Sequence, residues 1–413
     1  MKKVSLIAAA VATTLAAGSA FAVDFNGYMR AGTGISGNGN GDVSVNKNGI
    51  GRLGNENDNY YEFGLAEELK TGEQTWRVES MIAQGNKGSN GWEDGDFNVA
   101  QFAVKAKGVL SFDDEATLWA GKTYYQRKDI HITDFYFLDT SGTGGGIENL
   151  SIGDQKLSVA LIQDGDHDES TGYKFDTRLA NIGLWQDASL ELGLLYNFAT
   201  DSDNKSEEAD DGLLASAIIH QGMDNGFHQT ILQYGTNGYG VQAANLWGAG
   251  SYYARGTEAF NEASGFRLIN WGVMNLGESW EMGHQLAYLS GSDIGGADKD
   301  GNYTNKTFDI DQYSVVVRPM YKWNDTMRTI FEAGYNAGER IIGDKTNPMM
   351  GLATEDFGNA KFTVAQAWAM GDSWWARPEI RVYGSYILDT ENKEAFNGDD
   401  TEYVFGIQAE AWW

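Results

Sequence analysis

The last twelve residues of the chain, EYVFGIQAEAWW, alternate strictly between an apolar and a mostly polar side-chain face. Tyr403, Phe405 and Ile407 fall on one face, whereas Glu402 and Glu410 fall on the other. This alternation predicts a β-strand with one face in an apolar environment. A membrane-spanning strand of a β-barrel needs roughly 9–11 residues of this kind. A strand of a soluble β-sandwich alternates in the same way, so this pattern alone leaves both folds open.

The first 22 residues have the organisation of a secretory signal peptide. Two lysines and an apolar stretch precede Ala20-Phe21-Ala22, which fits the rule of small residues flanking a cleavage site. We therefore expect residues 1–22 to be removed and residues 23–413 to form a single domain. No later apolar run approaches the roughly 18 residues of a membrane helix, so an exported chain without a helical anchor is expected.

Composition agrees with a fold of many strands. Glycine accounts for 53 residues, aromatic residues for 13% and proline for only 3, which favours strands joined by turns over domains joined by a linker. The formal net charge of −28 argues against nucleic-acid binding, which depends on cationic contacts to phosphate. The chain has no cysteine, so disulfide bonds are excluded.

The two-faced strand pattern recurs along the whole chain. It is present at residues 24–31, 60–65, 157–163, 190–198, 227–234, 280–289, 312–320, 329–335, 361–368 and 379–386. Acidic stretches rich in Gly and Asn lie between some of these segments, at residues 164–170, 201–212 and 293–305, and are expected to be loops. We predict an all-β transmembrane barrel with long loops on one side and short turns on the other.

Aromatic and charged residues share the polar faces of several predicted strands. Tyr28 shares a face with Arg30, Tyr60 shares one with Glu62, and Trp412 lies on the polar face of the last strand. Aromatic rings beside ionised groups suit a carbohydrate ligand, because pyranose C–H faces pack on rings while hydroxyls bond to charged groups. The alternative is a filled interior, or rings that only stiffen the wall.

Longer motifs resemble the maltoporin family of outer-membrane sugar channels. They are the VDFNGY start of the mature chain, the RLGNE run at residues 52–56, residues 119–149, the RPMYKW and GDSWWARP runs, and the terminal Trp412-Trp413. The resemblance covers essentially the whole mature chain in order. It implies an 18-stranded antiparallel barrel in the bacterial outer membrane, assembled as a homotrimer of separate channels. It also implies a third loop that folds inward around residues 135–149 and narrows the lumen.

The resemblance further assigns residues to a sugar path. Its aromatic slide would consist of Tyr28, Tyr60, Trp92, Trp375 and Trp412, with Trp92 reaching into the channel of a neighbouring subunit. Its polar track at the constriction would consist of Arg30, Arg52, Glu62, Arg127, Asp129 and Asp134. Tyr136 would stand opposite the slide as a steric gate, whereas His131 receives no separate role.

The chain departs from the family pattern at two positions. Asn98 aligns with an arginine of the polar track. The remaining slide aromatic aligns near HQTILQY, where Thr230 stands in place of a ring and Phe227 is close by but out of register. The disulfide that pins the first loop in some relatives cannot form here, because the chain has no cysteine.

The function implied is facilitated diffusion of maltose and maltodextrins, with no cofactor, metal or energy source. A general diffusion porin, or a sister channel for another oligosaccharide such as sucrose, is the alternative. An enzyme is disfavoured because none of the five histidines lies in a GxSxG or HExxH context. Binding of a phage or adhesion partner through the long loops stays open, without a direct sign in the sequence.

Overall fold

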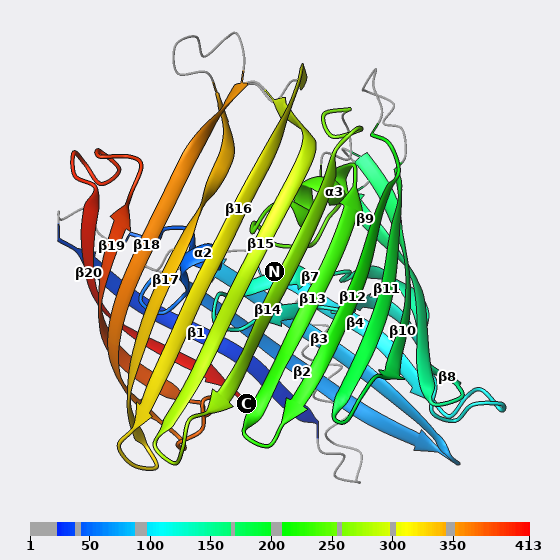
Figure 1. The fold of residues 1–413 in the computed structure, drawn as a ribbon. Helices are drawn as coiled ribbons and strands as arrows, with labels where there is room; N and C mark the ends of the chain where they lie inside the picture. Colours follow the sequence, from blue (N-terminus) through cyan, green and yellow to red (C-terminus); the bar gives the residue numbers. More distant parts are fainter. Residues whose placement is uncertain are drawn as a thin grey trace, which may run out of the picture.

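The computed structural model describes residues 23–37, 43–86, 97–166, 170–199, 209–253, 258–297, 303–343 and 352–413. These residues form a closed barrel of eighteen antiparallel strands (Figure 1). The barrel closes because β1 (Asp24–Ser36) pairs with both β2 (Asn59–Thr71) and β20 (Thr401–Trp412). The predicted fold class is therefore confirmed.

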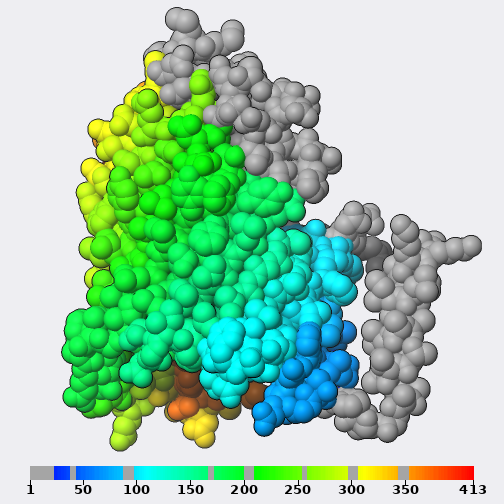
Figure 2. Space-filling view, turned by 90° about the vertical axis from the view of Figure 1, so that its right-hand side faces the viewer, coloured from blue at the N-terminus to red at the C-terminus, as the bar shows by residue number. Residues whose placement is uncertain are grey.

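Strand length varies around the barrel. The shorter strands are β3 (Gln74–Asn86), β4 (Asn98–Lys107), β5 (Thr117–Thr123), β8 (Gly142–Ile152), β9 (Gln155–Asp166), β10 (Ser170–Gly183), β11 (Ala188–Ala199), β12 (Gly212–Met223), β13 (Gly226–Thr236), β14 (Ser264–Asn275) and β19 (Glu379–Asp389). The longest strands, of 17 to 20 residues, are β15 (Trp280–Ala297), β16 (Tyr303–Lys322), β17 (Met327–Gly343) and β18 (Leu352–Ala369). The wall is therefore taller on the side of these strands, whose yellow and yellow-green atoms reach the upper left of the molecule in Figure 2.

The face assignment of the last strand is confirmed. Phe405 and Ile407 are 63% and 48% exposed on the outer surface, whereas Glu402 and Glu410 are buried inside. The expected loop at residues 293–305 is wrong in extent, because β15 continues to Ala297 and β16 begins at Tyr303. A paired hairpin can extend beyond the apolar belt without apolar residues, since its backbone groups are already hydrogen-bonded.

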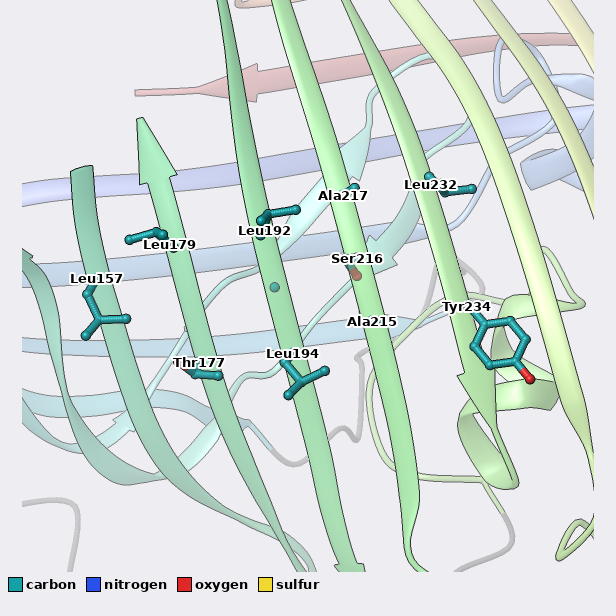
Figure 3. Close-up of a pocket in the computed structure, with 11 residues that line it drawn as sticks. Leu157, Thr177, Leu179, Leu192, Leu194, Ala215, Ser216, Ala217, Leu232 and Tyr234 are labelled. Carbon is teal, nitrogen blue, oxygen red and sulfur yellow. The ribbon is translucent and has the colours of Figure 1, made fainter. Parts of the chain in front are cut away.

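The outer surface is lined by apolar side chains, as a lipid-facing barrel requires. A depression of about 480 Å³ interrupts this surface between β9 and β13 (Figure 3). Leu192 and Leu194 border it, and Gly193 lies between them on the opposite face of β11. A Cβ at Gly193 would lie 2.6 Å from Arg178 Nη1, so this glycine leaves room for a buried guanidinium inside the wall.

The constriction segment, residues 124–141, differs in its bounds from the prediction. It folds inward with a small hairpin of β6 (Lys128–Ile130) and β7 (Phe135–Leu138), and the chain then returns to the wall as β8. The expected inward segment at residues 135–149 is therefore wrong in its second half. The glycine run pairs within the wall because it lets β8 approach β9 closely. At Gly144, for example, a Cβ would lie only 2.2 Å from the Leu161 carbonyl oxygen.

Two segments besides the constriction segment turn into the barrel, and neither was expected from the sequence. One carries α2 (Lys47–Ile50), and the other carries α3 (Gly238–Ala243). Ile50 is buried against the wall, and Lys361 Nζ donates a 2.6 Å hydrogen bond to the Leu53 carbonyl oxygen. None of the helices in the described residues is long and apolar enough to cross a membrane.

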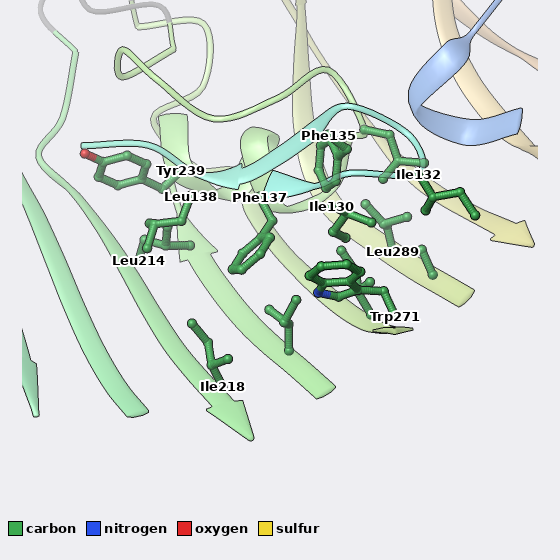
Figure 4. Close-up of a cluster of buried hydrophobic side chains, with 14 of the residues drawn as sticks. Ile130, Ile132, Phe135, Phe137, Leu138, Leu214, Ile218, Tyr239, Trp271 and Leu289 are labelled. Carbon is green, nitrogen blue, oxygen red and sulfur yellow. The ribbon is translucent and has the colours of Figure 1, made fainter. Parts of the chain in front are cut away.

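The main apolar core joins the constriction segment to the inner wall (Figure 4). Ile130, Phe135 and Phe137 project from β6 and β7 onto strands β12 to β15, where they meet Ile218 and Trp271. All three are 1% exposed or less. The hydrophobic effect therefore holds this segment against one side of the barrel, and the open lumen lies on the other side.

Candidate functional site

The constriction segment has two faces because its residues alternate. Ile130 and Ile132 pack on the wall, so Asp129 and His131, which alternate with them along the chain, face the lumen. Two wall arginines fix the backbone of the segment. Arg267 Nη2 donates to the Phe137 carbonyl oxygen at 2.8 Å, and Arg318 Nη2 donates to the Ile132 carbonyl oxygen at 2.7 Å. The segment is therefore held by both apolar packing and buried hydrogen bonds.

A cavity of about 400 Å³ lies between this segment and the wall formed by β1, β2 and β20. It is lined by Tyr28, Arg30, Arg52, Tyr60, Glu62, Arg127, Asp129, His131, Asp134, Tyr136 and Trp412. Three of the five expected slide aromatics and all seven expected constriction residues thus lie around one space. Residues far apart in the sequence meet here because the barrel closes between its first and last strands.

The aromatic side of the cavity is built by strand pairing. Tyr28 pairs with Trp412 across β1 and β20, and Arg30 pairs with Tyr60 across β1 and β2. The rings of Tyr28 and Tyr60 lie 6.0 Å apart, and the Arg30 guanidinium lies 5.4 Å from the Tyr60 ring centre. Tyr28 Oη donates to Glu410 Oε1 at 2.9 Å, so this ring has a fixed orientation.

Trp412 and Trp375 are connected through His131. The His131 ring lies 5.2 Å from the Trp375 ring and 5.8 Å from the Trp412 ring, centre to centre. The Arg377 guanidinium lies 4.5 Å from the centre of the Trp412 ring, within cation–π range. Trp375 is 38% exposed and lies between β18 and β19, at the turn end of the barrel. These rings continue the aromatic side of the cavity toward that end.

A network of ion pairs forms the polar side. Arg30 contacts Asp58 at 2.7 Å, Glu56 at 3.1 Å and Asp134 at 3.3 Å. Arg52 contacts Glu56 at 2.6 Å and Glu410 at 3.0 Å. These charges are paired, because an isolated charge in so enclosed a space would carry a large desolvation cost.

Arg127 is held between two aromatic rings. Its guanidinium carbon lies 4.2 Å from the centre of the Tyr124 ring and 4.4 Å from that of Tyr136. Arg127 Nη1 lies 3.7 Å from Glu62 Oε1, and its Nε lies 3.6 Å from Asp139 Oδ2. The phenol of Tyr136 is thereby positioned in the cavity lining, opposite the rings of the barrel wall.

Asp129 and Asp134 of the constriction segment differ in the direction of their pKa shifts. Although burial opposes it, the positive charges of Arg52, Lys47 and Arg30 hold the pKa of Asp134 well below its ordinary value. Burial, reinforced by the nearby Asp134 charge, raises the pKa of Asp129. Burial and the Arg52 charge lower the pKa of His131 well below its ordinary value, which favours the neutral imidazole. Asp134 thus carries the more persistent negative charge.

Two alignment-based expectations can be compared with the strand faces. Thr230 lies on the outward face of β13, so the expectation that it stands in place of a slide ring is wrong. Phe227 lies on the inward face, with its ring 5.2 Å from that of Trp271. Asn98 begins β4 and borders a recess of about 350 Å³ beside Tyr60. Trp92 lies outside the described residues.

Several residues of the site were not expected from the sequence. Asp58 and Lys47 approach from the inward segment that carries α2, and Tyr124 donates a 2.8 Å hydrogen bond to Glu62. Glu410 was recognisable as an inward residue from the alternation of the last strand. The others had no local signal, because their contacts depend on where the inward segments lie. Among the described residues, no group of three or more His, Asp or Glu side chains is placed to hold a metal ion.

A closed transmembrane barrel whose lumen is narrowed by an inward segment with paired charges has the architecture of a porin. The chain belongs to the LamB porin family, which matches it over residues 23–413. It is accordingly a bacterial outer-membrane β-barrel protein.

Named relatives include two maltoporins. The maltoporin of Vibrio cholerae serotype O1 (strain ATCC 39315 / El Tor Inaba N16961) is 78% identical over 419 residues, covering 100% of both chains. The maltoporin of Photobacterium profundum is 42% identical over 435 residues, covering 98% of each. Among solved structures, OpdK of Pseudomonas aeruginosa with vanillate has a TM-score of 0.52 at 12% identity, covering 95% of this chain and 99% of that one. This last likeness shows the fold alone.

Proposed function

We propose that the chain is a sugar-specific channel through which maltose and maltodextrins diffuse down their concentration gradient across the outer membrane. The observation that carries this proposal is the cavity itself, which the Tyr28, Tyr60 and Trp412 rings line together with charged side chains. The two maltoporins that are 78% and 42% identical to the chain support the same substrate class.

The aromatic rings and the charged groups bind different parts of the sugar. The apolar faces of glucose units pack on the aromatic side, which Trp375 extends toward the turn end of the barrel. The hydroxyl groups exchange hydrogen bonds with charged partners such as Arg30 and Glu62. These partners are already paired with one another, so each sugar contact replaces an existing bond and the net gain stays small.

Movement follows from the repetition of similar contacts. A maltodextrin that advances by one glucose unit exchanges each contact for an equivalent one, so the barriers between successive positions stay low. A channel must bind its solute well enough to recruit it and weakly enough to release it. Tyr136, fixed beneath Arg127, limits the width opposite the rings.

The assembly belongs to the same proposal. The working unit is a homotrimer of separate channels, in which Trp92 of one subunit extends the aromatic path of a neighbour. Residues 1–22 act as a signal peptide that is removed during export. The long loops of the outer face are also the surface that a phage or adhesin would meet first.

The test is the ion current through the purified protein in a planar bilayer, titrated with maltotriose to maltohexaose. We expect saturable block that strengthens with chain length, and Trp412→Ala to weaken it by about fivefold, the effect of one aromatic contact of about 1 kcal/mol. Trp413→Ala is the matched control, because Trp413 packs on Phe25 at the outer surface. Current that no maltodextrin blocks would contradict the proposal, and block by sucrose alone would change the substrate.

A further inference from the structure

The helix α3 lies near the loop end of the barrel, beside the tall strands (Figure 1). A second cavity lies between residues 245–247 and the ends of these strands. It measures about 450 Å³ and shares no lining residue with the constriction cavity. Residues 44–46, residues 245–247 and strands β15 to β19 contribute to its walls. The inward segment that carries α2 separates the two spaces, since Asn46 lines this cavity and Arg52 lines the constriction. We call it the vestibule cavity.

An exposed tryptophan forms part of the vestibule cavity. Trp247 is 70% exposed, although its ring is stacked on that of Tyr253 at 6.2 Å and an angle of 29°. Tyr253 Oη donates a 2.6 Å hydrogen bond to the Gly248 carbonyl oxygen, which fixes this ring pair to its own loop. The backbone N–H of Ala249 donates to the Tyr136 carbonyl oxygen at 2.8 Å, which fixes the loop to the constriction segment. One ring face is therefore held beside the cavity.

Side-chain amides line other parts of the vestibule cavity. Asn245 donates its amide N–H to the Val241 carbonyl oxygen at 2.9 Å, and Gln312 donates to the Ala244 carbonyl oxygen at 2.7 Å. Asn359 donates to Asp389 Oδ2 at 3.2 Å. These bonds fix the amide planes before any ligand arrives, which lowers the entropic cost of binding.

Charged side chains also line the vestibule cavity, among them Glu339 and Arg340. The Nε and Nη2 atoms of Arg340 donate to Glu355 Oε1 at 3.0 and 2.8 Å, and the guanidinium lies 5.9 Å from the Phe357 ring centre. Its positive charge is balanced by this carboxylate, so the cavity does not select for an anion. Half of the Arg340 side chain remains exposed, with N–H groups available to a neutral hydroxylated ligand.

We propose that the vestibule cavity is a second sugar-binding site, which captures a segment of an oligosaccharide before it enters the constriction. A fixed aromatic face, oriented amides and a neutralised arginine are the groups that recognise a pyranose. The volume lies within the range of about 300–1,000 Å³ that is usual for small-molecule sites. This inference rests on the proposed function for its substrate class, but the site can be tested separately from the constriction.

The test compares wild type with Trp247→Ala, using maltohexaose added to one side of a planar bilayer at a time. A capture site outside the constriction changes the rate at which sugar enters from the loop end, but it does not change how tightly sugar binds in the constriction. We therefore expect entry from the loop end to slow by about fivefold, as for the loss of one aromatic contact. Entry from the turn end and the ionic conductance should not change. Trp247→Phe should restore most of the rate.

Trp185→Ala is the matched control, because Trp185 is 60% exposed but lies in the turn between β10 and β11. Saturation-transfer NMR with maltotriose gives a second readout, which does not require the constriction to bind sugar. A Trp247→Ala variant that loses part of the saturation transfer supports the vestibule site even if sugar does not block the current. Unchanged entry rates together with unchanged saturation transfer would overturn the inference and leave the proposed function standing.

Discussion

Individual side chains in the constriction are positioned by contacts from several directions. Arg127 is the clearest example, because two tyrosine rings enclose its guanidinium and two carboxylates lie within 3.7 Å. Lysine could keep the charge there but would lose the planar stacking. Glu62 likewise accepts hydrogen bonds from both Tyr60 and Tyr124. Specificity at this scale depends on groups whose orientation is fixed before the ligand arrives.

Phe227 gives the prediction at the residue scale. Because its ring faces inward, we expect Phe227→Ala to lower maltohexaose affinity in current-block titrations by about fivefold, the value of one aromatic contact. Thr230→Ala, on the opposite face of the same strand, should leave the affinity unchanged. Equal affinities in wild type and Phe227→Ala, with normal conductance, would remove this ring from the sugar path.

Inward segments are the elements that turn a wide barrel into a selective channel. Their apolar faces pack on the wall, and wall side chains satisfy their backbone groups. Arg267 alone donates to the carbonyl oxygens of Phe137, Gln242 and Asn245, and so joins the constriction segment to the segment that carries α3. It also donates to Gln233 Oε1 at 2.9 Å. One buried guanidinium therefore fixes two elements at once.

At this scale we predict the effect of Arg267→Met. The change removes the donors of three buried carbonyl oxygens, and each unsatisfied group costs about 1–3 kcal/mol. We expect a looser constriction, with higher single-channel conductance and weaker sugar block in bilayer recordings. Lys393→Met is the control, because the ion pair of Lys393 with Asp400 lies on an exposed loop. A folded Arg267→Met channel with wild-type conductance would show that apolar packing and the Arg318 hydrogen bond hold the segment without Arg267.

The whole molecule depends on closure between its first and last strands. Closure removes free strand edges and satisfies the backbone groups that lipid could not. It also assembles the site, because Tyr28 and Arg30 come from the first strand and Trp412 from the last. At the seam, the Gly27 and Trp413 backbones exchange two hydrogen bonds of 3.2 Å.

For the whole molecule, we predict that a larger side chain at Gly27 destabilises the closed barrel. A Cβ there would lie 2.5 Å from the Trp413 ring at the seam and 2.5 Å from the Glu62 carbonyl oxygen on β2, so Gly27→Val must displace the chain beside the seam. We expect a loss of about 1–3 kcal/mol of stability, measured as a lower denaturation midpoint or less folded barrel by electrophoretic heat-modifiability. Gly183→Val is the control, because nothing lies within 4 Å of the corresponding position. Equal midpoints for the two variants would contradict a tight seam.

The sequence alone determined the strand class, the lumen-facing side of the last strand and the placement of Tyr28, Tyr60 and Trp412 on polar faces. These features follow from the alternation of side chains along a strand, which is a local property of two-residue period. The motifs that resemble the maltoporin family added the strand number and most of the constriction residues. That resemblance compares whole motifs, so it could reach positions that have no periodic signal.

Only the tertiary structure decided where the non-strand segments lie. It assigned Gly142 to the wall, turned Thr230 outward and Phe227 inward, and placed the segments that carry α2 and α3 inside the barrel. These outcomes depend on contacts between distant residues, such as the bond from Arg267 to Phe137 across 130 positions. Local patterns carry no information about such contacts, because their free energy arises only when the closed wall brings the partners together.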